Sequence, residues 1–271
     1  MTDRTELKLL EEIRSIAREA GDAIMGVYGR EFGVDLKEDR SPLTEADRVS
    51  HALITRRLSS LATQLPVLSE EAPPEQTAKR REWRRYWLVD PLDGTKEFIK
   101  RNGEFTVNIA LIDAHAPVLG VVNAPALDRE YFGGPGIGAW RRDGAGEAVP
   151  IAVRTPPAVP VRVVGSRSHP SPDLARYVAA LGEHALKSMG SSLKICLVAE
   201  GEADVYPRFG PTSEWDTAAA QAVLEGAGGV MIDVAGQPLR YNCKADLLNP
   251  HFLAVGDRTR DWLAPFQTAS R

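Results

Sequence analysis

The segment that most constrains this chain is 86–98 (YWLVDPLDGTKEF), because an apolar run there ends in two closely spaced carboxylates. Residues 87–89 are all apolar and predict a short buried strand. Asp90 follows at once, and the proline after it cannot continue a strand ladder. Asp93 comes next, and residues 96–99 predict the start of a short helix. Two acids therefore stand between the carboxyl end of a strand and the N-terminus of a helix.

Such an arrangement supplies both parts of a phosphate site, since carboxylates bind hard divalent cations and helix N-termini bind phosphate. Two further acids occupy comparable places. Glu70 follows a predicted strand over 66–69, and Asp216 begins a predicted helix over 214–225. Strand carboxyl ends are where open α/β sheets bind their ligands. The candidate metal-binding residues are Glu70, Asp90, Asp93 and Asp216.

The alternative for each acid alone is a surface or helix-capping role, which is the commoner one. Four converging carboxylates would repel one another unless cations lay between them. Two ions roughly 4 Å apart can polarise a phosphate and activate water, and Asp90 is placed to bridge them. The all-oxygen set favours Mg²⁺, and zinc is disfavoured because the motifs contain no His or Cys.

Two other chemistries use similar segments. Phosphatases with an aspartyl nucleophile have one residue between the two acids of D-x-D-G-T, whereas two residues separate Asp90 from Asp93. The spacing on a strand decides which face each acid occupies, so it favours direct attack by water. An EF-hand is disfavoured because the alternating oxygen ligands and the terminal Glu are missing.

The composition and charge bear on the cellular location of the protein and on the kinds of molecule it can bind. The 271 residues are 43% hydrophobic with a net charge of −4, which argues against non-specific nucleic-acid binding. An anionic substrate would need local cations, so we expect metal to bind before or with it. Cys196 and Cys243 are expected to be buried free thiols. Without a leader or a run of ~20 apolar residues, we expect a cytoplasmic protein; peripheral membrane association is left open.

Hydrophobic periodicity predicts a long amphipathic helix over residues 7–24. Thr44 opens a second helix, and Asp47 completes a capping box with it. Elsewhere in the first half we expect a strand over 32–37, a polar turn over 38–42, an exposed charged loop over 72–85, strands over 105–112 and 118–122, a hairpin over 130–140 and a turn over 141–146.

Three prolines within residues 149–159 mark the best boundary between two halves, 1–155 and 156–271. The second half alternates strands with helices, which predicts a layered α/β arrangement. We expect strands over 161–165, 185–188, 203–206 and 229–233, and helices over 172–181, 190–200 and 214–225.

Three motifs in this order, 68–71 (LSEE), 90–95 (DPLDGT) and 215–218 (WDTA), resemble the inositol monophosphatase superfamily of Mg²⁺-dependent, lithium-sensitive phosphatases. The resemblance runs from the first helix to about Val255. It implies the layered α-β-α-β-α sandwich of that superfamily, an α+β half followed by an α/β half.

Further segments are most similar to the bacterial 3′(2′),5′-bisphosphate nucleotidases of that superfamily. These are 93–98 (DGTKEF), 166–169 (SRSH) and 190–194 (GSSLK). Inositol monophosphatases usually have Asn where this chain has Glu97, and they usually lack Lys194. The first half would carry the metal and water-activating motifs, and the second half the substrate loops and the last metal ligand.

The resemblance implies a role for each acid. Glu70, Asp90 and the Leu92 carbonyl would bind one Mg²⁺, and Asp90, Asp93 and Asp216 a second, while a third ion is left open. Asp47, Thr95 and Glu70 would be catalytic, with Asp47 and Thr95 orienting or deprotonating the attacking water. The alternative for Asp47 is capping alone. The amides of Gly94 and Thr95 would receive the phosphate.

A bisphosphorylated substrate also needs cations away from the metals. Lys194, Arg208 and His169 are the candidates, although Lys194 could instead lie on a solvated helix face and the other two in surface loops. Residues 190–192 could form an anion cradle. The full substrate-binding set is Glu70, Leu92, Asp93, Gly94, Thr95, Ser166, Ser168, His169, Gly190, Ser191, Ser192, Lys194, Arg208 and Asp216.

The expected activity is hydrolysis of the 3′-phosphate of adenosine 3′,5′-bisphosphate (PAP) to AMP, and of its sulfated form PAPS, within sulfur metabolism. The alternatives are an inositol monophosphatase, a fructose 1,6-bisphosphatase, or a non-catalytic metal- or nucleotide-binding sensor. The partner is a small phosphorylated nucleotide, and the chain is expected to be a monomer or homodimer.

Overall fold

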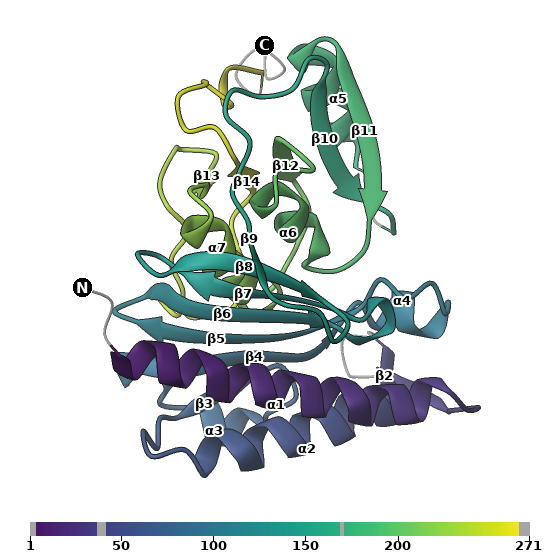
Figure 1. Ribbon diagram of the computed structural model, residues 1–271, viewed down its shortest axis with the longest axis vertical. Coiled ribbons are helices and arrows are strands. Elements are labelled where there is room, and N and C mark those ends of the chain that lie inside the picture. Colours follow the sequence, from purple (N-terminus) through teal and green to yellow (C-terminus); the bar gives the residue numbers. More distant parts are fainter. Residues whose placement is uncertain (1–3, 37–41, 169–170, 266–271) are drawn as a thin grey trace.

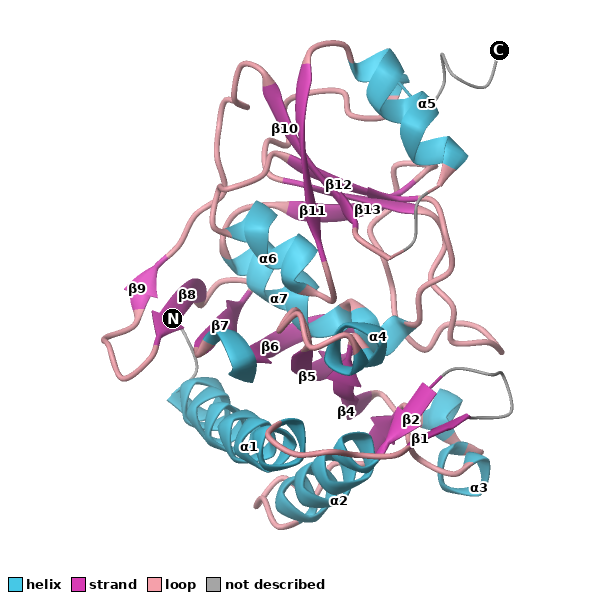
Figure 2. Cartoon of the chain, turned by 90° about the vertical axis from the view of Figure 1, so that its right-hand side faces the viewer, coloured by secondary structure: helices cyan, strands magenta, loops and turns pink. Residues whose placement is uncertain are grey.

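The computed structural model describes residues 4–36, 42–168 and 171–265. Its elements stack in five layers (Figure 1), which confirms the predicted α-β-α-β-α sandwich. From bottom to top in that view come helices α1 (Arg4–Tyr28) and α2 (Glu45–Ser59), a seven-stranded sheet, helices α6 (Leu193–Ala199) and α7 (Ala218–Gly226), and a five-stranded sheet. Helix α5 (Pro172–Leu181) is the fifth layer and packs on the face of the five-stranded sheet that α6 and α7 do not cover. Figure 2 shows α1 and α2 below the larger sheet and α6 and α7 above it.

The larger sheet buries both of its faces. Trp87 and Val89 pack with α1 and α2, whereas Leu88 between them packs with α6 and α7, as the alternation of side chains along a strand requires. All of its neighbouring strands are antiparallel except β3 and β4, which are parallel. In spatial order the strands are β3 (Val67–Ser69), β4 (Arg85–Asp93), β5 (Thr106–Asp113), β6 (Ala116–Ala124), β7 (Arg129–Gly134), β8 (Gly138–Asp143) and β9 (Val149–Pro150).

The smaller sheet mixes parallel and antiparallel pairs. Its spatial order is β11 (His184–Met189), β10 (Val161–Ser166), β12 (Val205–Arg208), β14 (Phe252–Val255) and β13 (Val230–Asp233). Strand β14 lies between β12 and β13 and was not predicted from the sequence. The chain changes sheets between β9 and β10, near the expected boundary after residue 155, which stays a prediction.

Several short elements complete the described chain. They are β1 (Val34–Leu36), β2 (Pro42–Thr44), α3 (Pro74–Thr77), α4 (Thr95–Ile99) and the 3₁₀ turns Arg80–Glu82, Pro125–Leu127 and Glu214–Asp216. The strand expected over 32–37 is therefore shorter. Most of the turn expected over 38–42 lies outside the described residues, and Pro42 itself begins β2. No helix among the described residues is long and apolar enough to cross a bilayer.

Strand β4 does not end at Val89, as the sequence suggested, but continues to Asp93. Asp90 pairs with Asn108 of β5 and Asp93 with Thr106, so β4 advances three residues while β5 advances two. The extra residue is a β-bulge, a place where a strand tolerates proline. Side chains three apart on a regular strand point to opposite faces; the bulge brings both carboxylates to the same side.

Two further expectations were wrong. The segment 72–85 is not an exposed loop throughout, because Arg80 is buried and its guanidinium donates to the Asn242 side chain and to backbone carbonyls of the 244–245 segment. These acceptors compensate the Arg80 guanidinium for its lost hydration. The number of charged residues in the segment cannot reveal such distant partners. Cys196 is buried as expected, but Cys243 is exposed.

Helix α7 packs so closely on β6 at Gly120 that a Cβ there would lie 2.1 Å from the Ala219 carbonyl oxygen. We expect Gly120→Ala to lower the free energy of unfolding by about 2 kcal/mol or more, because backbone must move. The control Gly26→Ala, on α1 with nothing within 4 Å, should raise it by about 0.5 kcal/mol. Urea unfolding measures both; equal stability of the two variants would contradict this close packing.

Candidate functional site

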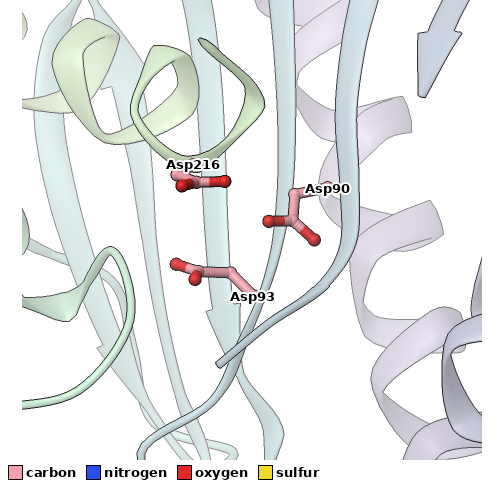
Figure 3. Close-up of side chains that lie close together, drawn as sticks. All are labelled: Asp90, Asp93 and Asp216. Atoms are coloured by element: carbon pink, nitrogen blue, oxygen red, sulfur yellow. The ribbon is translucent and has the colours of Figure 1, made fainter. Parts of the chain in front are cut away.

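Three carboxylates from the two halves of the chain face one another at the predicted place (Figure 3). Asp90 and Asp93 lie on either side of the β4 bulge, and Asp216 ends the 3₁₀ turn before α7. Each offers an oxygen atom, and the three oxygens lie within 4.8 Å of one another. Asp90 is almost fully buried, whereas Asp93 and Asp216 are half-buried and line a cavity.

Glu70 completes the predicted set of four acids. It follows β3, which pairs in parallel with β4, and its backbone N–H donates to the Val89 carbonyl (3.2 Å). Its side chain lines the same cavity as Asp93 and Asp216. The four acids chosen from sequence therefore meet in one place.

Their mutual effect appears in the pKa values. Burial raises the pKa of Asp90 well above its usual range, and the charges of Glu70, Asp93 and Asp216 raise it further. Burial raises the pKa of Asp93 to about 6, while the charge of Lys194 lowers it. Burial and then the charge of Asp93 raise the pKa of Asp216.

A buried group of like charges is unfavourable without a counter-ion. The donor atoms are all oxygen and close together, so the set fits a hard divalent cation such as Mg²⁺. This chemistry agrees with the expected cofactor.

Backbone contacts hold these carboxylates in position. Asp90 Oδ1 accepts from the Leu92 N–H (3.0 Å) across the bulge. Asp216 Oδ2 accepts from the Ser213 N–H (2.9 Å), which closes a capping box at its 3₁₀ turn. Asp216 thus has the capping contact that was its alternative role, and it still faces the cluster.

Asp47 contacts Thr95 as the resemblance implied. The Thr95 hydroxyl donates to Asp47 Oδ1 (3.3 Å) and lies 3.4 Å from the Leu92 carbonyl oxygen. Asp47 Oδ2 accepts from the Thr44 backbone N–H and hydroxyl (both 2.7 Å), forming the predicted capping box of α2. Its two oxygens divide between helix cap and Thr95, so the two interpretations of Asp47 do not exclude each other.

The cavity over the cluster measures about 240 Å³ and is open to solvent. Most of the predicted substrate residues line it, namely Glu70, Asp93, Gly94, Thr95, Ser166, Gly190, Ser191, Ser192, Lys194, Arg208 and Asp216. Leu92 is buried beside it. Ser168 instead donates to the Glu97 carboxylate and lines a neighbouring cavity. His169 lies outside the described residues.

Lys194 is not on a solvated helix face. Lys194 is only 7% exposed. Its ammonium donates to the Ser191 carbonyl and lies 5.5 Å from the centre of the Tyr206 ring. Burial lowers the pKa of Lys194 to about 8, although the charge of Asp93 acts in the opposite direction. A buried ammonium beside carboxylates creates a cavity with both signs of charge.

Arg208 lies between this cavity and the next. Its Nη2 donates to the Pro211 carbonyl (2.7 Å), and its buried Nε has no hydrogen-bond partner among the described residues. The next cavity, of about 510 Å³, shares Ser166, Tyr206 and Arg208 with the first. Its remaining lining is largely apolar and includes Leu174, Pro207, Phe209 and Pro211.

Two polar residues of β5 escaped the sequence analysis. Thr106 Oγ1 lies 2.9 Å from Ser192 Oγ, which donates to Asn108 Oδ1 (2.8 Å). Asn108 Nδ2 in turn lies 3.5 Å from Asp93 Oδ2. The signal was present in the sequence, because these polar residues stand at alternate positions of a strand that is otherwise apolar up to Ile112, and so they share one face.

Known proteins resemble this chain in sequence and in fold. The inositol monophosphatase family matches residues 6–264. A curated relative from Shigella flexneri, a 3′(2′),5′-bisphosphate nucleotidase CysQ, is 53% identical over 90% of this chain and 98% of its own; that of Escherichia coli K12 is 52% identical with the same coverage.

Solved structures of family members also resemble this chain. CysQ from Bacteroides thetaiotaomicron is 43% identical, with a TM-score of 0.81, over 93% of this chain and 98% of that one. An inositol monophosphatase from Anabaena, 24% identical with a TM-score of 0.75, covers 97% of both chains and shares the fold. On the sequence match and the shared architecture, this chain belongs to the inositol monophosphatase family.

Proposed function

We propose that this chain is a 3′(2′),5′-bisphosphate nucleotidase that hydrolyses the 3′-phosphate of PAP to give AMP and phosphate, and that also accepts PAPS. The observation that carries the proposal is a single cavity lined both by the acid cluster and by the buried Lys194. Such a cavity suits a substrate with one phosphate at the metals and a second anionic group at a cation. Relatives above 50% identity carry the nucleotidase name.

We assign the metal-binding groups as follows. Glu70, Asp90 and the Leu92 carbonyl would bind one Mg²⁺, and Asp90, Asp93 and Asp216 a second. Bound Mg²⁺ supplies Lewis acidity towards the phosphate and lowers the pKa of water. The close approach of the carboxylate oxygens supports this assignment.

The chain's own residues orient the attacking water. The Thr95 hydroxyl donates its hydrogen to Asp47, so its lone pairs can accept a hydrogen from water. The Thr44 contacts fix Asp47 and therefore fix the direction of the Thr95 hydroxyl. Glu70 lines the same cavity and completes the catalytic set.

The substrate would span both cavities. The amides of Gly94 and Thr95 would bind the cleaved phosphate, because they adjoin the acid cluster. Lys194 and Arg208 would bind the second anionic group, with the hydroxyls of Ser166, Ser191 and Ser192. The apolar neighbouring cavity would contact the base, and an inositol ring offers no apolar group for such walls.

A substrate panel tests the proposed activity. With Mg²⁺, we expect kcat/KM for PAP to exceed that for inositol 1-phosphate and fructose 1,6-bisphosphate by about 10²-fold or more, because specificity is a ratio of these constants. Millimolar lithium should inhibit, as the family resemblance implies. Faster phosphate release from inositol 1-phosphate, or activity insensitive to lithium, would overturn the assignment.

Asp90→Asn separates an enzyme from a sensor. We expect turnover to fall by about 10³-fold or more, since the loss of about 4 kcal/mol of transition-state stabilisation corresponds to that factor. The melting temperature without Mg²⁺ should rise, because one of several mutually repelling charges is removed. Phosphate release and thermal unfolding are measured on both proteins.

The matched control for this substitution is Asp22→Asn, at an exposed position of α1, which should change neither quantity. A variant of Asp90 that retained turnover would mean that the cluster is not catalytic.

Lys194→Ala tests the second anion site. We expect KM for PAP to rise by about tenfold or more, because a hydrogen bond to a charged group contributes about 1.5–3 kcal/mol, while KM for adenosine 3′-monophosphate should change much less. Lys187→Ala, exposed on β11, is the control. Equal effects of Lys194→Ala on both substrates would remove Lys194 from the substrate site.

A further inference from the structure

A carboxylate outside the acid cluster joins the two halves of the chain at Gly190, which lines the cavity. We propose that Glu104 is a positioning residue that fixes the segment 190–192 and thereby sets the affinity of the site for the second anionic group of its substrate. The link to affinity rests on the function proposed above. The link to the segment rests on geometry alone.

Glu104 belongs to the connection between α4 and β5, and its side chain is only 14% exposed. Its carboxylate accepts three hydrogen bonds from the second half of the chain. Arg167 donates through Nε to Oε2 (2.8 Å) and through Nη2 to Oε1 (2.7 Å), and the Gly190 N–H donates to Oε2 (2.7 Å). A paired contact with a guanidinium is among the stronger and more directional hydrogen-bond geometries.

These donors stand at the ends of two neighbouring parallel strands. Arg167 directly follows β10, and Gly190 directly follows β11. The strand ends are joined as well, because the Arg167 N–H donates to the Met189 carbonyl (3.3 Å) and its Nη2 to the Ser188 carbonyl (3.0 Å). One carboxylate from the first half therefore fixes the carboxyl ends of both strands.

Packing reinforces the hydrogen bond at Gly190. A Cβ at this position would lie 2.7 Å from the Glu104 carbonyl oxygen and 2.8 Å from Glu97 Cγ. The backbone of the segment thus lies directly on the 97–104 region, and only glycine allows that approach. The Gly190 backbone is therefore held against the 97–104 region by close packing and by the hydrogen bond to the Glu104 carboxylate.

The other end of the segment is fixed independently. The Ser192 N–H donates to Asp93 Oδ2 (2.6 Å), and its hydroxyl contacts Thr106 and Asn108. Between the two fixed ends, Ser191 has a left-handed backbone (φ 45°) and its carbonyl accepts the Lys194 ammonium. Moving the Gly190 end would displace Ser191 and with it the carbonyl that the Lys194 ammonium contacts, while the Ser192 contact with Asp93 would remain.

The charge of Glu104 has its partner in Arg167, so it does not confront an anionic substrate uncompensated. Arg167 is 45% exposed, and an ion pair that open to solvent adds little stability. The contribution specific to the site is the bond to the Gly190 amide. The hydrogen bond to the Gly190 amide is what distinguishes a positioning role for Glu104 from a general contribution to stability.

Steady-state kinetics test the link to affinity. For Glu104→Ala we expect KM for PAP to rise by about tenfold, kcat to change by less than about twofold, and KM for adenosine 3′-monophosphate, which lacks the second phosphate, to change by less than about threefold. Glu104→Gln keeps an acceptor for the Gly190 amide and should restore most of the affinity. Glu147→Ala, at an exposed position, is the matched control.

Hydrogen exchange tests the link to the segment without any turnover. The Gly190 amide should exchange at least about tenfold faster in Glu104→Ala than in the wild type because it loses its acceptor, whereas the Ser192 amide keeps Asp93 Oδ2 as its acceptor and should change much less. Arg167→Ala leaves that acceptor in place and should show a smaller increase. It also provides a second test if Glu104→Ala does not fold.

The outcomes are distinct. Unchanged exchange in Glu104→Ala overturns the positioning role, and faster exchange with equal KM changes for both substrates overturns the link to the second anionic group. A wild-type protein that does not hydrolyse PAP overturns the proposed function, and the exchange measurement still decides the role of Glu104.

Discussion

Mutual repulsion among buried carboxylates is the constraint on which the rest of this structure depends. Asp90, Asp93 and Asp216 would separate if they stood on flexible segments, because burial strengthens the repulsion between like charges. Each is instead fixed by a backbone N–H, from Leu92, Ser192 and Ser213 respectively. The sandwich supplies rigid supports for a group of charges that favours a cation.

One extra residue in a strand gives this site its geometry. The bulge in β4 turns a spacing that would place two acids on opposite faces into one that places them together. The Ser50 hydroxyl donates to the Pro91 carbonyl within the bulge (2.7 Å), which connects it to the helix whose cap includes Asp47. The acid cluster and the Asp47–Thr95 pair are therefore fixed by the same few residues.

Local signals predicted much of this protein. The helix over 172–181 was placed at its observed bounds, and the capping box at Thr44 located the start of α2, because both depend only on neighbouring residues. The acids were found because each stands where a predicted element begins or ends. The family resemblance added the pairing of Asp47 with Thr95, which no local pattern indicates.

What the sequence did not reveal depends on partners far along the chain. Arg80 was expected in solvent, yet its acceptors lie about 160 residues away. Strand β14 has four residues and is defined mainly by the strands on either side of it. Glu104 gained its place only when its donors, more than 60 residues distant, were known. A bulge likewise needs its partner strand before it can be recognised.

The origin of Asp216 in the second half, when the other cluster acids lie in the first, has an evolutionary consequence. Neither half carries all four acids, so neither half alone could assemble the cluster. Recombination that exchanged the second halves of two relatives would have to preserve the fit of α7 on β6 at Gly120. We therefore expect the two halves of such genes to have been inherited together, with sequence changes concentrated in the loops around the cavity.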